Sequence, residues 1–165
     1  DHRDLHSFPT RRSSDLFHHV LLFAHLAGVI LWVGGMAFAH FCLRPAALAL
    51  PPAQRLPLWC GVLGRFFRVV WLAIGLIVGS GFAMLGATGF AQAPVAWHAM
   101  AGIGLVMVAV FASIWFGPWQ ALQQAVAAEN WAGGAAALNR IRQRVGLNLL
   151  LGVFTVAVAT LGLAV

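Results

Sequence analysis

Two histidines lie within one apolar run of the sequence, FAHLAGVILWVGGMAFAH, which covers residues 23–40. An ionisable side chain is costly inside a lipid bilayer, so its presence there suggests a function by default. The imidazoles of His25 and His40 could bind a metal ion or a haem iron, or could carry a proton. Each could also be a neutral group that bonds to a neighbouring hydroxyl or carbonyl, and the pattern alone leaves these alternatives open.

The composition predicts the surroundings of these histidines. Of the 165 residues, 61% are hydrophobic and only 8% are charged, whereas soluble domains devote about a quarter of their residues to charge. We therefore predict an integral membrane protein in contact with the lipid bilayer. The net charge of +6 does not indicate nucleic-acid binding, because the basic residues are all Arg and from Phe17 onward they lie between apolar spans.

Four apolar segments are long enough to cross a bilayer, which takes about 20 residues. They cover residues 17–43, 66–89, 95–117 and 145–165. Arg residues lie in or beside the first and third connections, and the second connection has none, so the positive-inside rule places both termini and the second connection in the periplasm. The prediction is an all-α, up-down-up-down four-helix bundle, one domain over residues 17–165, in the bacterial inner membrane.

The ends of this domain carry two further expectations. HSFPTRRSSDL (His6–Leu16) resembles a translated sequencing adapter, so we expect residues 1–16 to be a non-native or disordered leader and the natural start to be missing. The connection before the fourth span is rich in Ala and Gln, and we expect it to be helical on both sides of Gly133–Gly134.

Helix geometry places possible ligands from different spans at one depth. Counting about 1.5 Å per residue from the Arg-rich ends, His25 and His98 both lie roughly 28–30 Å from the inner boundary. Met84 reaches the same level, and Met100 lies one turn below it. This arrangement predicts a site near the periplasmic face.

On the first span, a rotation of about 100° per residue puts small and polar residues on one stripe that should face the bundle interior. The stripe consists of His25, Gly28, Trp32, Gly35, Met36 and Ala39. His40 falls about 60° off this stripe and roughly 22 Å deeper. We regard His40 as a secondary candidate, together with His18 and His19 at the outer end.

No arrangement of side chains predicts an enzyme. Glu129 is the only carboxylate side chain after Asp15, which excludes acid–base catalysis by a pair of carboxylates in the spans. The sequence shows no nucleophile–base pair, phosphate-binding glycine loop or CxxC motif. Any chemistry must therefore come from a bound metal or cofactor.

The stretch HLAGVILWVGGMAFAHFCLRPA resembles the first span of the CopD-type (copper resistance protein D-like) membrane domain, in which a His precedes W-x-G-G. The resemblance continues in LGRFFRVVWLAIGLIVGSGFAML, in WHAM and in RIRQRVGLNLLLG, and it covers nearly all of residues 17–165. It implies copper binding, uptake or resistance, and a periplasmic copper carrier or redox partner. Imidazole and thioether are copper ligands, so His25, His98, Met84 and Met100 are the candidate site, and His18 or His19 could capture the ion.

Two alternatives remain at this stage. The layout is also similar to HemJ-type protoporphyrinogen oxidases, although the Lys expected in that group is missing because the chain has no Lys. A b-type haem protein would use His25 and His98 as axial ligands, with Trp32 and the glycines making room for the macrocycle. A third interpretation is a structural subunit whose histidines only bond within the bundle.

Overall fold

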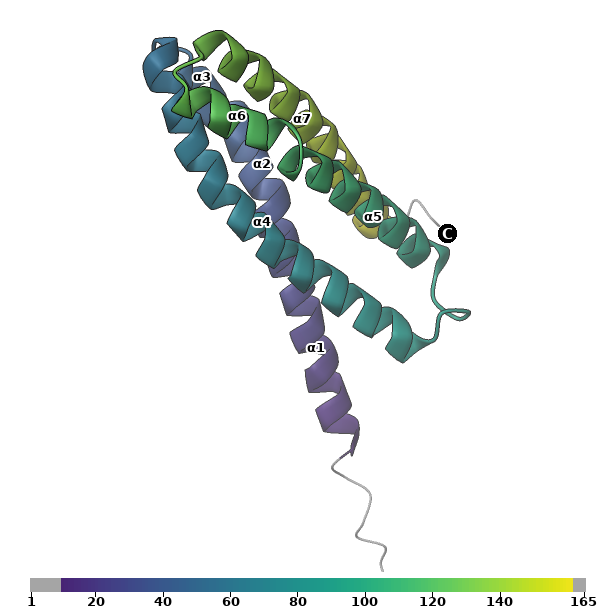
Figure 1. Ribbon diagram of the computed structural model, residues 1–165. Helices are drawn as coiled ribbons and strands as arrows, with labels where there is room; N and C mark the ends of the chain where they lie inside the picture. The colour runs from purple at the N-terminus through teal and green to yellow at the C-terminus, as the bar shows by residue number, and fades with distance from the viewer. Residues whose placement is uncertain (1–9, 162–165) are drawn as a thin grey trace, which may run out of the picture.

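The computed structural model describes residues 10–161, and in this part of the chain all regular structure is helical (Figure 1). The helices are α1 (Thr10–Val29), η1 (Ile30–Gly34), α2 (Gly35–Phe38), η2 (Ala39–Leu43), α3 (Arg44–Ala47), α4 (Pro52–Thr88), α5 (Val95–Trp115), α6 (Pro118–Ala127) and α7 (Trp131–Leu161). Of the expected leader, residues 1–9 lie outside the described residues and residues 10–16 belong to α1. That this leader is non-native stays a prediction.

Among the described residues, four helical segments are long and apolar enough to cross a membrane. They are Asp15–Ala47, Pro52–Thr88, Val95–Ala127 and Trp131–Leu161, with 33, 37, 33 and 31 residues. Large apolar side chains face outward along them, for example Phe23 and Ile30, which are 74% and 70% exposed. Such a surface suits lipid, and the prediction of an all-α, multi-pass membrane protein is confirmed.

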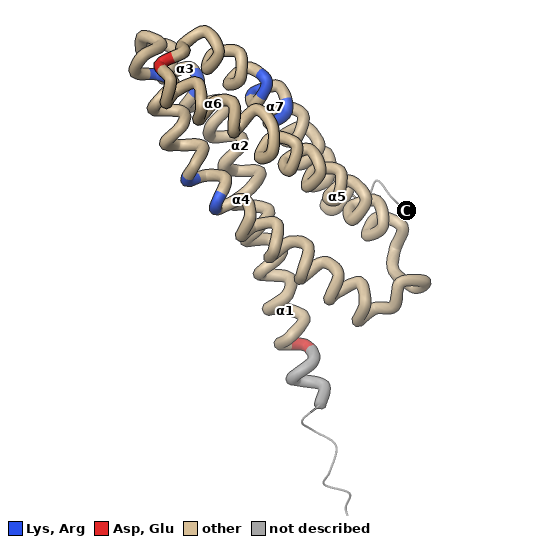
Figure 2. Tube along the Cα trace, viewed as in Figure 1, with Lys and Arg blue, Asp and Glu red and all other residues tan. Residues whose placement is uncertain are grey.

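The arginines from Arg44 to Arg144 lie in one half of the molecule, which we call the Arg-bearing end. α4 packs along α1, and α7 packs along α5 and α6. Figure 2 shows the positions of the basic residues along α3, the first half of α4 and the first half of α7. At the opposite end, the connection over residues 89–94 between α4 and α5 has no Lys or Arg.

The first membrane segment contains two π-helical stretches, η1 and η2. A π-turn takes more residues than an α-turn, so it changes which side chains follow one another on a face. Trp32 and Met36 are buried as the stripe predicts, at 3% and 1% exposure. Beyond them Ala39 and His40 are both half-buried and line one pocket, so the expected 60° offset of His40 does not turn it away from the interior.

The connection between α6 and α7 differs from the expectation. The helix is interrupted at residues 128–130, where Glu129 has a positive φ of 52°, and not at Gly133–Gly134. Asn130 starts α7 because its side-chain oxygen accepts a hydrogen bond from the backbone N–H of Gly133 at 2.9 Å. Gly134 is buried inside α7, where a Cβ would come within 3.0 Å of the Leu56 side chain on α4. Close packing, and not a turn, therefore explains this glycine.

Arg144 supports the break between α5 and α6. Its guanidinium Nη1 donates to the Ser113 carbonyl at 2.7 Å and lies 3.2 Å from the Ser113 hydroxyl. Because α6 begins at Pro118, which has no backbone N–H, the last carbonyls of α5 need other donors. A cation on α7 supplies one at the helix C-terminus, where it is electrostatically favoured.

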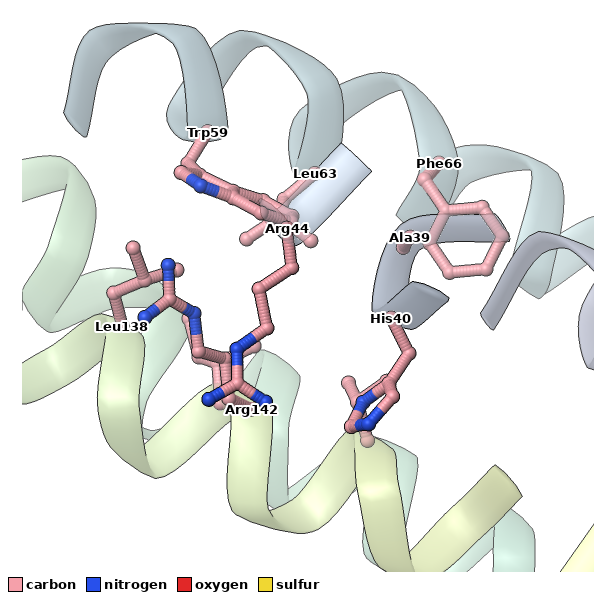
Figure 3. A pocket seen from close by; sticks show the side chains of 10 residues that line it. Ala39, His40, Arg44, Trp59, Leu63, Phe66, Leu138 and Arg142 are labelled. Atoms are coloured by element: carbon pink, nitrogen blue, oxygen red, sulfur yellow. The ribbon is translucent and has the colours of Figure 1, made fainter. Parts of the chain in front are cut away.

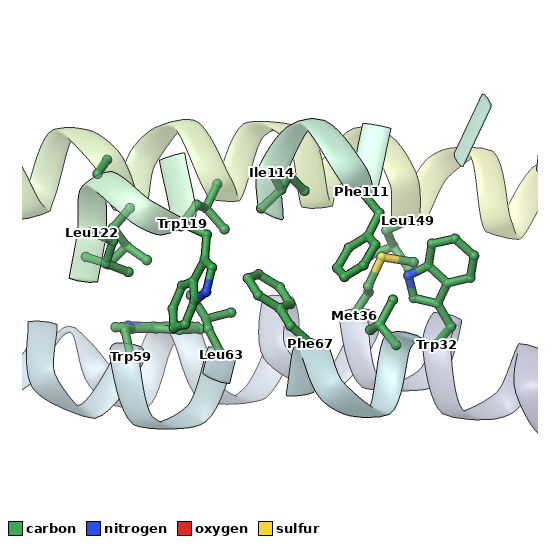
Figure 4. Close-up of a cluster of buried hydrophobic side chains, with 14 of the residues drawn as sticks. Trp32, Met36, Trp59, Leu63, Phe67, Phe111, Ile114, Trp119, Leu122 and Leu149 are labelled. Carbon is green, nitrogen blue, oxygen red and sulfur yellow. The ribbon is translucent and has the colours of Figure 1, made fainter. Parts of the chain in front are cut away.

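Aromatic side chains form the centre of the core (Figure 4). Phe67 on α4 meets Phe111 on α5 and Trp119 on α6, with ring centroids 5.4 and 5.2 Å apart in edge-on geometry. Trp32 meets Phe111 from the first membrane segment at 6.2 Å. Trp119 and Trp59 are each only 4% exposed, so both belong to the core. This core extends from the Arg-bearing end to the middle of the bundle.

Glycines on the first membrane segment allow a close approach to α4. A Cβ at Gly28 would lie 2.7 Å from Ile77 and 3.0 Å from the Ala73 carbonyl oxygen, and one at Gly35 would collide with the Phe66 ring. The expected packing role of these two glycines is confirmed. Gly75 and Gly79 on α4 have no such role within the chain, because nothing lies within 4 Å of a Cβ at either position.

We expect Gly28→Ala to lower the free energy of unfolding by about 1–3 kcal/mol, since the added methyl group meets a backbone carbonyl that cannot rotate away. Thermal unfolding in detergent measures the effect. Gly34→Ala is the matched control in the same segment, because a Cβ there has nothing within 4 Å. Equal melting temperatures of the two variants would contradict the close approach.

Candidate functional site

A cavity of about 350 Å³ lies between α1, α4, α5 and α7, away from the Arg-bearing end. Most of its lining is apolar. The side chains in the lining that can form hydrogen bonds are His18, His25, Trp32, Trp97, Thr155 and Thr160. Both threonine hydroxyls donate to carbonyls of their own helix, Leu151 and Val156 respectively. The histidines are therefore the main polar side chains in the lining that could offer a ring nitrogen to a ligand.

Hydrogen bonds from α4 determine the tautomer of His25. Nδ1 lies 3.1 Å from the Ile77 carbonyl oxygen and 3.1 Å from the Ser80 hydroxyl oxygen. A carbonyl can only accept, so Nδ1 carries the hydrogen and donates it. The Ser80 hydroxyl gives its own hydrogen to the Leu76 carbonyl at 2.5 Å, which leaves its oxygen to accept from His25.

This tautomer leaves the other ring nitrogen of His25 with a free lone pair. In a neutral imidazole with a hydrogen on Nδ1, Nε2 is an acceptor and a metal ligand. A metal-binding histidine commonly donates its second nitrogen to a carbonyl in this way, which fixes the ring. Gly81 makes room for the ring, because a Cβ there would lie 3.3 Å from Cε1 of His25. The half-buried His25 is thus oriented by a neighbouring helix and has Nε2 available.

Three thioethers line the same cavity as His25: those of Met84 and Met100, which are sequence-based candidates, and that of Met107, which is buried in the core. Met84 follows Ser80 by one turn of α4, and Met100 follows Trp97 by about one turn of α5. Both side chains are half-buried. The structure therefore brings together His25, Met84, Met100 and Trp32 from the sequence-based candidates, around one apolar space.

His98 is not among the residues that line this cavity. Its side chain is exposed, and its Nε2 donates to the Phe90 carbonyl at 3.0 Å. This bond ties the start of α5 to the connection over residues 89–94. Depth along the span is compatible with the predicted partnership of His98 with His25, but the structure gives the two side chains different surroundings.

The secondary candidates occupy three different positions. His18 lines the cavity two turns before His25 on α1, whereas His19 donates from Nδ1 to the Asp15 carbonyl of its own helix. Their rings meet edge to face at 6.1 Å. His40 lies in a separate pocket with Arg44 at the Arg-bearing end, and its ring packs against Phe41 at 5.0 Å (Figure 3).

The donor set around the cavity is soft. Within residues 15–161, no group of three or more His, Cys, Asp or Glu side chains is placed to hold a metal ion. The imidazoles of His18 and His25 and the thioethers of Met84, Met100 and Met107 are the candidate donors in the cavity lining. Such a set is poorly suited to Mg²⁺ or Ca²⁺, which require oxygen ligands, and it suits Cu(I), which accepts thioether sulfur.

Sequence reasoning missed Ser80, which is 5% exposed and bonds to the ring of His25. The available signal was its position: it is the single hydroxyl residue between Arg65 and Leu85, one turn from Met84. The Ile77 carbonyl could not be found from residue types, because every residue carries one.

Comparison with known proteins gives one match. A family model described as CopD, copper resistance protein D, matches residues 60–161. The matched range includes Ser80, Met84 and Met100, whereas His25 lies before it. No curated protein and no solved structure shows a significant match to the chain.

Proposed function

Because the chain belongs to the copper resistance protein D family, we propose that this multi-pass membrane protein binds copper as its substrate in the outer half of the bilayer. The site is the cavity between α1, α4, α5 and α7, with Nε2 of His25 and the sulfurs of Met84 and Met100 as ligands. The observation that carries the proposal is the hydrogen bonding of His25, which directs its hydrogen to α4 and leaves Nε2 free.

The distribution of arginines supports an orientation in the membrane. Positive residues are enriched on the cytoplasmic side of membrane proteins, and the arginines between residues 44 and 144 all lie in the half that contains α3 and α6 (Figure 2). We therefore propose an up-down-up-down bundle in the bacterial inner membrane, with both ends of the described chain and the cavity on the periplasmic side. His18 lies in the cavity lining nearer the N-terminus of α1 and is proposed to receive the ion first.

The core supports reception of copper from the periplasm rather than an open channel. Trp32 lines the cavity and packs on Phe111, and Phe111 packs on Phe67. These side chains are at most 3% exposed and separate the cavity from the Arg-bearing end. A periplasmic copper carrier or a redox partner would deliver the ion to the open side.

The size of the cavity favours haem b as a second candidate ligand. About 350 Å³ is far more than one ion needs, since a water molecule occupies about 30 Å³ of liquid. His25 fits as an axial ligand, Met84 or Met100 could be the other, and Trp32 would form a wall; bound haem would supply electron transfer or haem-linked oxidation. No Arg or Lys lines the cavity to pair with the haem propionates, so the fit is incomplete.

One experiment distinguishes the two ligands. The protein is purified in detergent after expression with added copper, and the same sample is analysed for metals and by ultraviolet–visible absorption. The copper proposal predicts bound copper and no Soret band. A Soret band that disappears in the His25→Ala variant would instead establish the haem alternative. If the sample contains neither copper nor haem, the interpretation as a structural subunit is favoured.

We expect Ser80→Ala to weaken copper binding about tenfold without loss of the fold. The substitution removes one of the two acceptors that orient His25, and changes of such supporting groups cost 10–100-fold in metal affinity; the Ile77 carbonyl remains, so the smaller effect is expected. Competition with a Cu(I) chelator measures the affinity. Thr155→Val is the matched control, because that hydroxyl lines the same cavity but bonds to Leu151. Equal losses in the two variants would contradict an orienting role for Ser80.

A further inference from the structure

A second pocket lies at the Arg-bearing end, between the first membrane segment, α4 and α7 (Figure 3). His40 and Arg44 reach it from the first segment, Trp59 from α4 and Arg142 from α7. Its free volume is about 30 Å³, the space of roughly one water molecule. The rest of the lining is apolar, and it contains no carboxylate side chain.

Three buried nitrogen donors on residues that line this pocket have no acceptor among the described residues. They are Nε and Nη2 of Arg142 and Nε1 of Trp59. The Arg142 guanidinium carbon lies 5.4 Å from the centre of the Trp59 ring, so the groups belong to one cluster. A buried donor without an acceptor, and a partly buried cation without a counter-charge, are both costly.

The positive charge around this cluster is also uncompensated. Arg44 lines the same pocket as Arg142, so two like charges face one small space. The nearest carboxylate in sequence, Glu129, is exposed and does not line the pocket. Figure 3 shows the side chains of Arg44 and Arg142 reaching into the pocket from different helices. Like charges held together in this way favour an anion between them.

We propose that this pocket binds a phosphate-bearing anion. Nε and Nη2 form the edge of a guanidinium that binds two oxygens of one phosphate in parallel, and Trp59 Nε1 supplies a third donor. Arg44 is exposed, so its long side chain can move aside and then close on the anion from α3. The phosphate ties the first membrane segment to α7 and neutralises their repulsion. The proposal does not depend on copper binding at the other end.

The phosphate comes either from the headgroup of an anionic phospholipid or from free inorganic phosphate. Basic pockets between membrane helices on the cytoplasmic side are known to bind anionic headgroups. Both sources present the same oxygens to the same donors, and the binding experiment separates them.

The experiment uses the full chain in nanodiscs of phosphatidylcholine, with either phosphatidylglycerol or inorganic phosphate added in steps, and reads the melting temperature and the bound lipid by native mass spectrometry. We expect the wild type to be stabilised. Arg142→Gln should raise the apparent Kd about tenfold, as expected for loss of a charge-assisted bidentate contact. Arg140→Gln is the matched control, because it removes the same charge from an exposed site outside the pocket.

Trp59→Phe provides a second test that retains an aromatic ring and removes the N–H together with the rest of the pyrrole ring, with an expected rise in Kd of about threefold. Stabilisation by phosphatidylglycerol alone identifies a lipid headgroup, and stabilisation by inorganic phosphate identifies the free anion; both support the site. No stabilisation of the wild type by either probe overturns it. Equal weakening by Arg140→Gln and Arg142→Gln also overturns it, because binding would then reflect only net charge.

Discussion

We expect His25→Ala to weaken copper binding to the purified protein at least about a hundredfold, or about 2.8 kcal/mol. The variant removes Nε2 of His25, which the hydrogen bonds of Nδ1 to α4 leave free to bind a metal ion in the cavity. Two thioethers alone hold a copper ion weakly, since imidazole contributes the stronger donor. Chelator competition and metal analysis of the detergent-solubilised protein measure the loss.

Two other histidines are controls for this result. His98 is exposed and donates to the Phe90 carbonyl, and His40 lies in the pocket at the other end. We expect His98→Ala and His40→Ala to keep the copper stoichiometry of the wild type. If His98→Ala lost copper as His25→Ala does, the original pairing of His25 with His98 would be correct and the Met-containing site would be wrong.

The second large effect concerns the thioethers. We expect the double variant Met84→Leu, Met100→Leu to lose about a hundredfold in Cu(I) affinity and to melt close to the wild type, because Leu conserves the volume and removes only the sulfur. Chelator competition under reducing conditions gives the affinity.

Met36→Leu is the matched control for the double variant. Met36 is 1% exposed in the aromatic core and does not line the cavity, so its sulfur should not matter for copper. An unchanged Cu(I) affinity of the double variant would exclude Met84 and Met100 as ligands and leave His25 without the proposed partners.

Much of the fold follows from residue types because it depends on hydrophobic length. Segments of more than 20 apolar residues must be helical in lipid, since only a helix satisfies its own backbone there. The stripe predicts the burial of Trp32 and Met36 correctly, since Trp32 lies in η1 and Met36 follows it by only four residues. Farther along, η1 and η2 change the phase of the helix, and the position of His40 could not be obtained by counting 100° per residue.

The turn before α7 shows how a local signal misleads. Two adjacent glycines suggested a break, yet Asn130 caps the helix three residues before Gly133 and provides the stronger start signal. Gly134 is small because Leu56 on another helix lies against it. A sequence does not distinguish a glycine required by a turn from one required by close packing.

The sequence predicts the level of each candidate residue along its helix, but not the direction in which its side chain points. Rise per residue correctly grouped His25, Met84 and Met100, which line one cavity. It also grouped His98, whose side chain is held by a carbonyl in the connection over residues 89–94. The carbonyl of Ile77 and the hydroxyl of Ser80 orient His25 from α4, and such contacts depend on how two helices pack.

X-ray absorption spectroscopy of the Cu(I)-loaded protein tests the central proposal most directly, because it identifies the atoms bound to the metal. We predict a first shell that contains one imidazole nitrogen and thioether sulfur, with the imidazole contribution missing in His25→Ala. A shell of nitrogen or oxygen alone, or a spectrum that His25→Ala leaves unchanged, would contradict a copper site built from His25, Met84 and Met100.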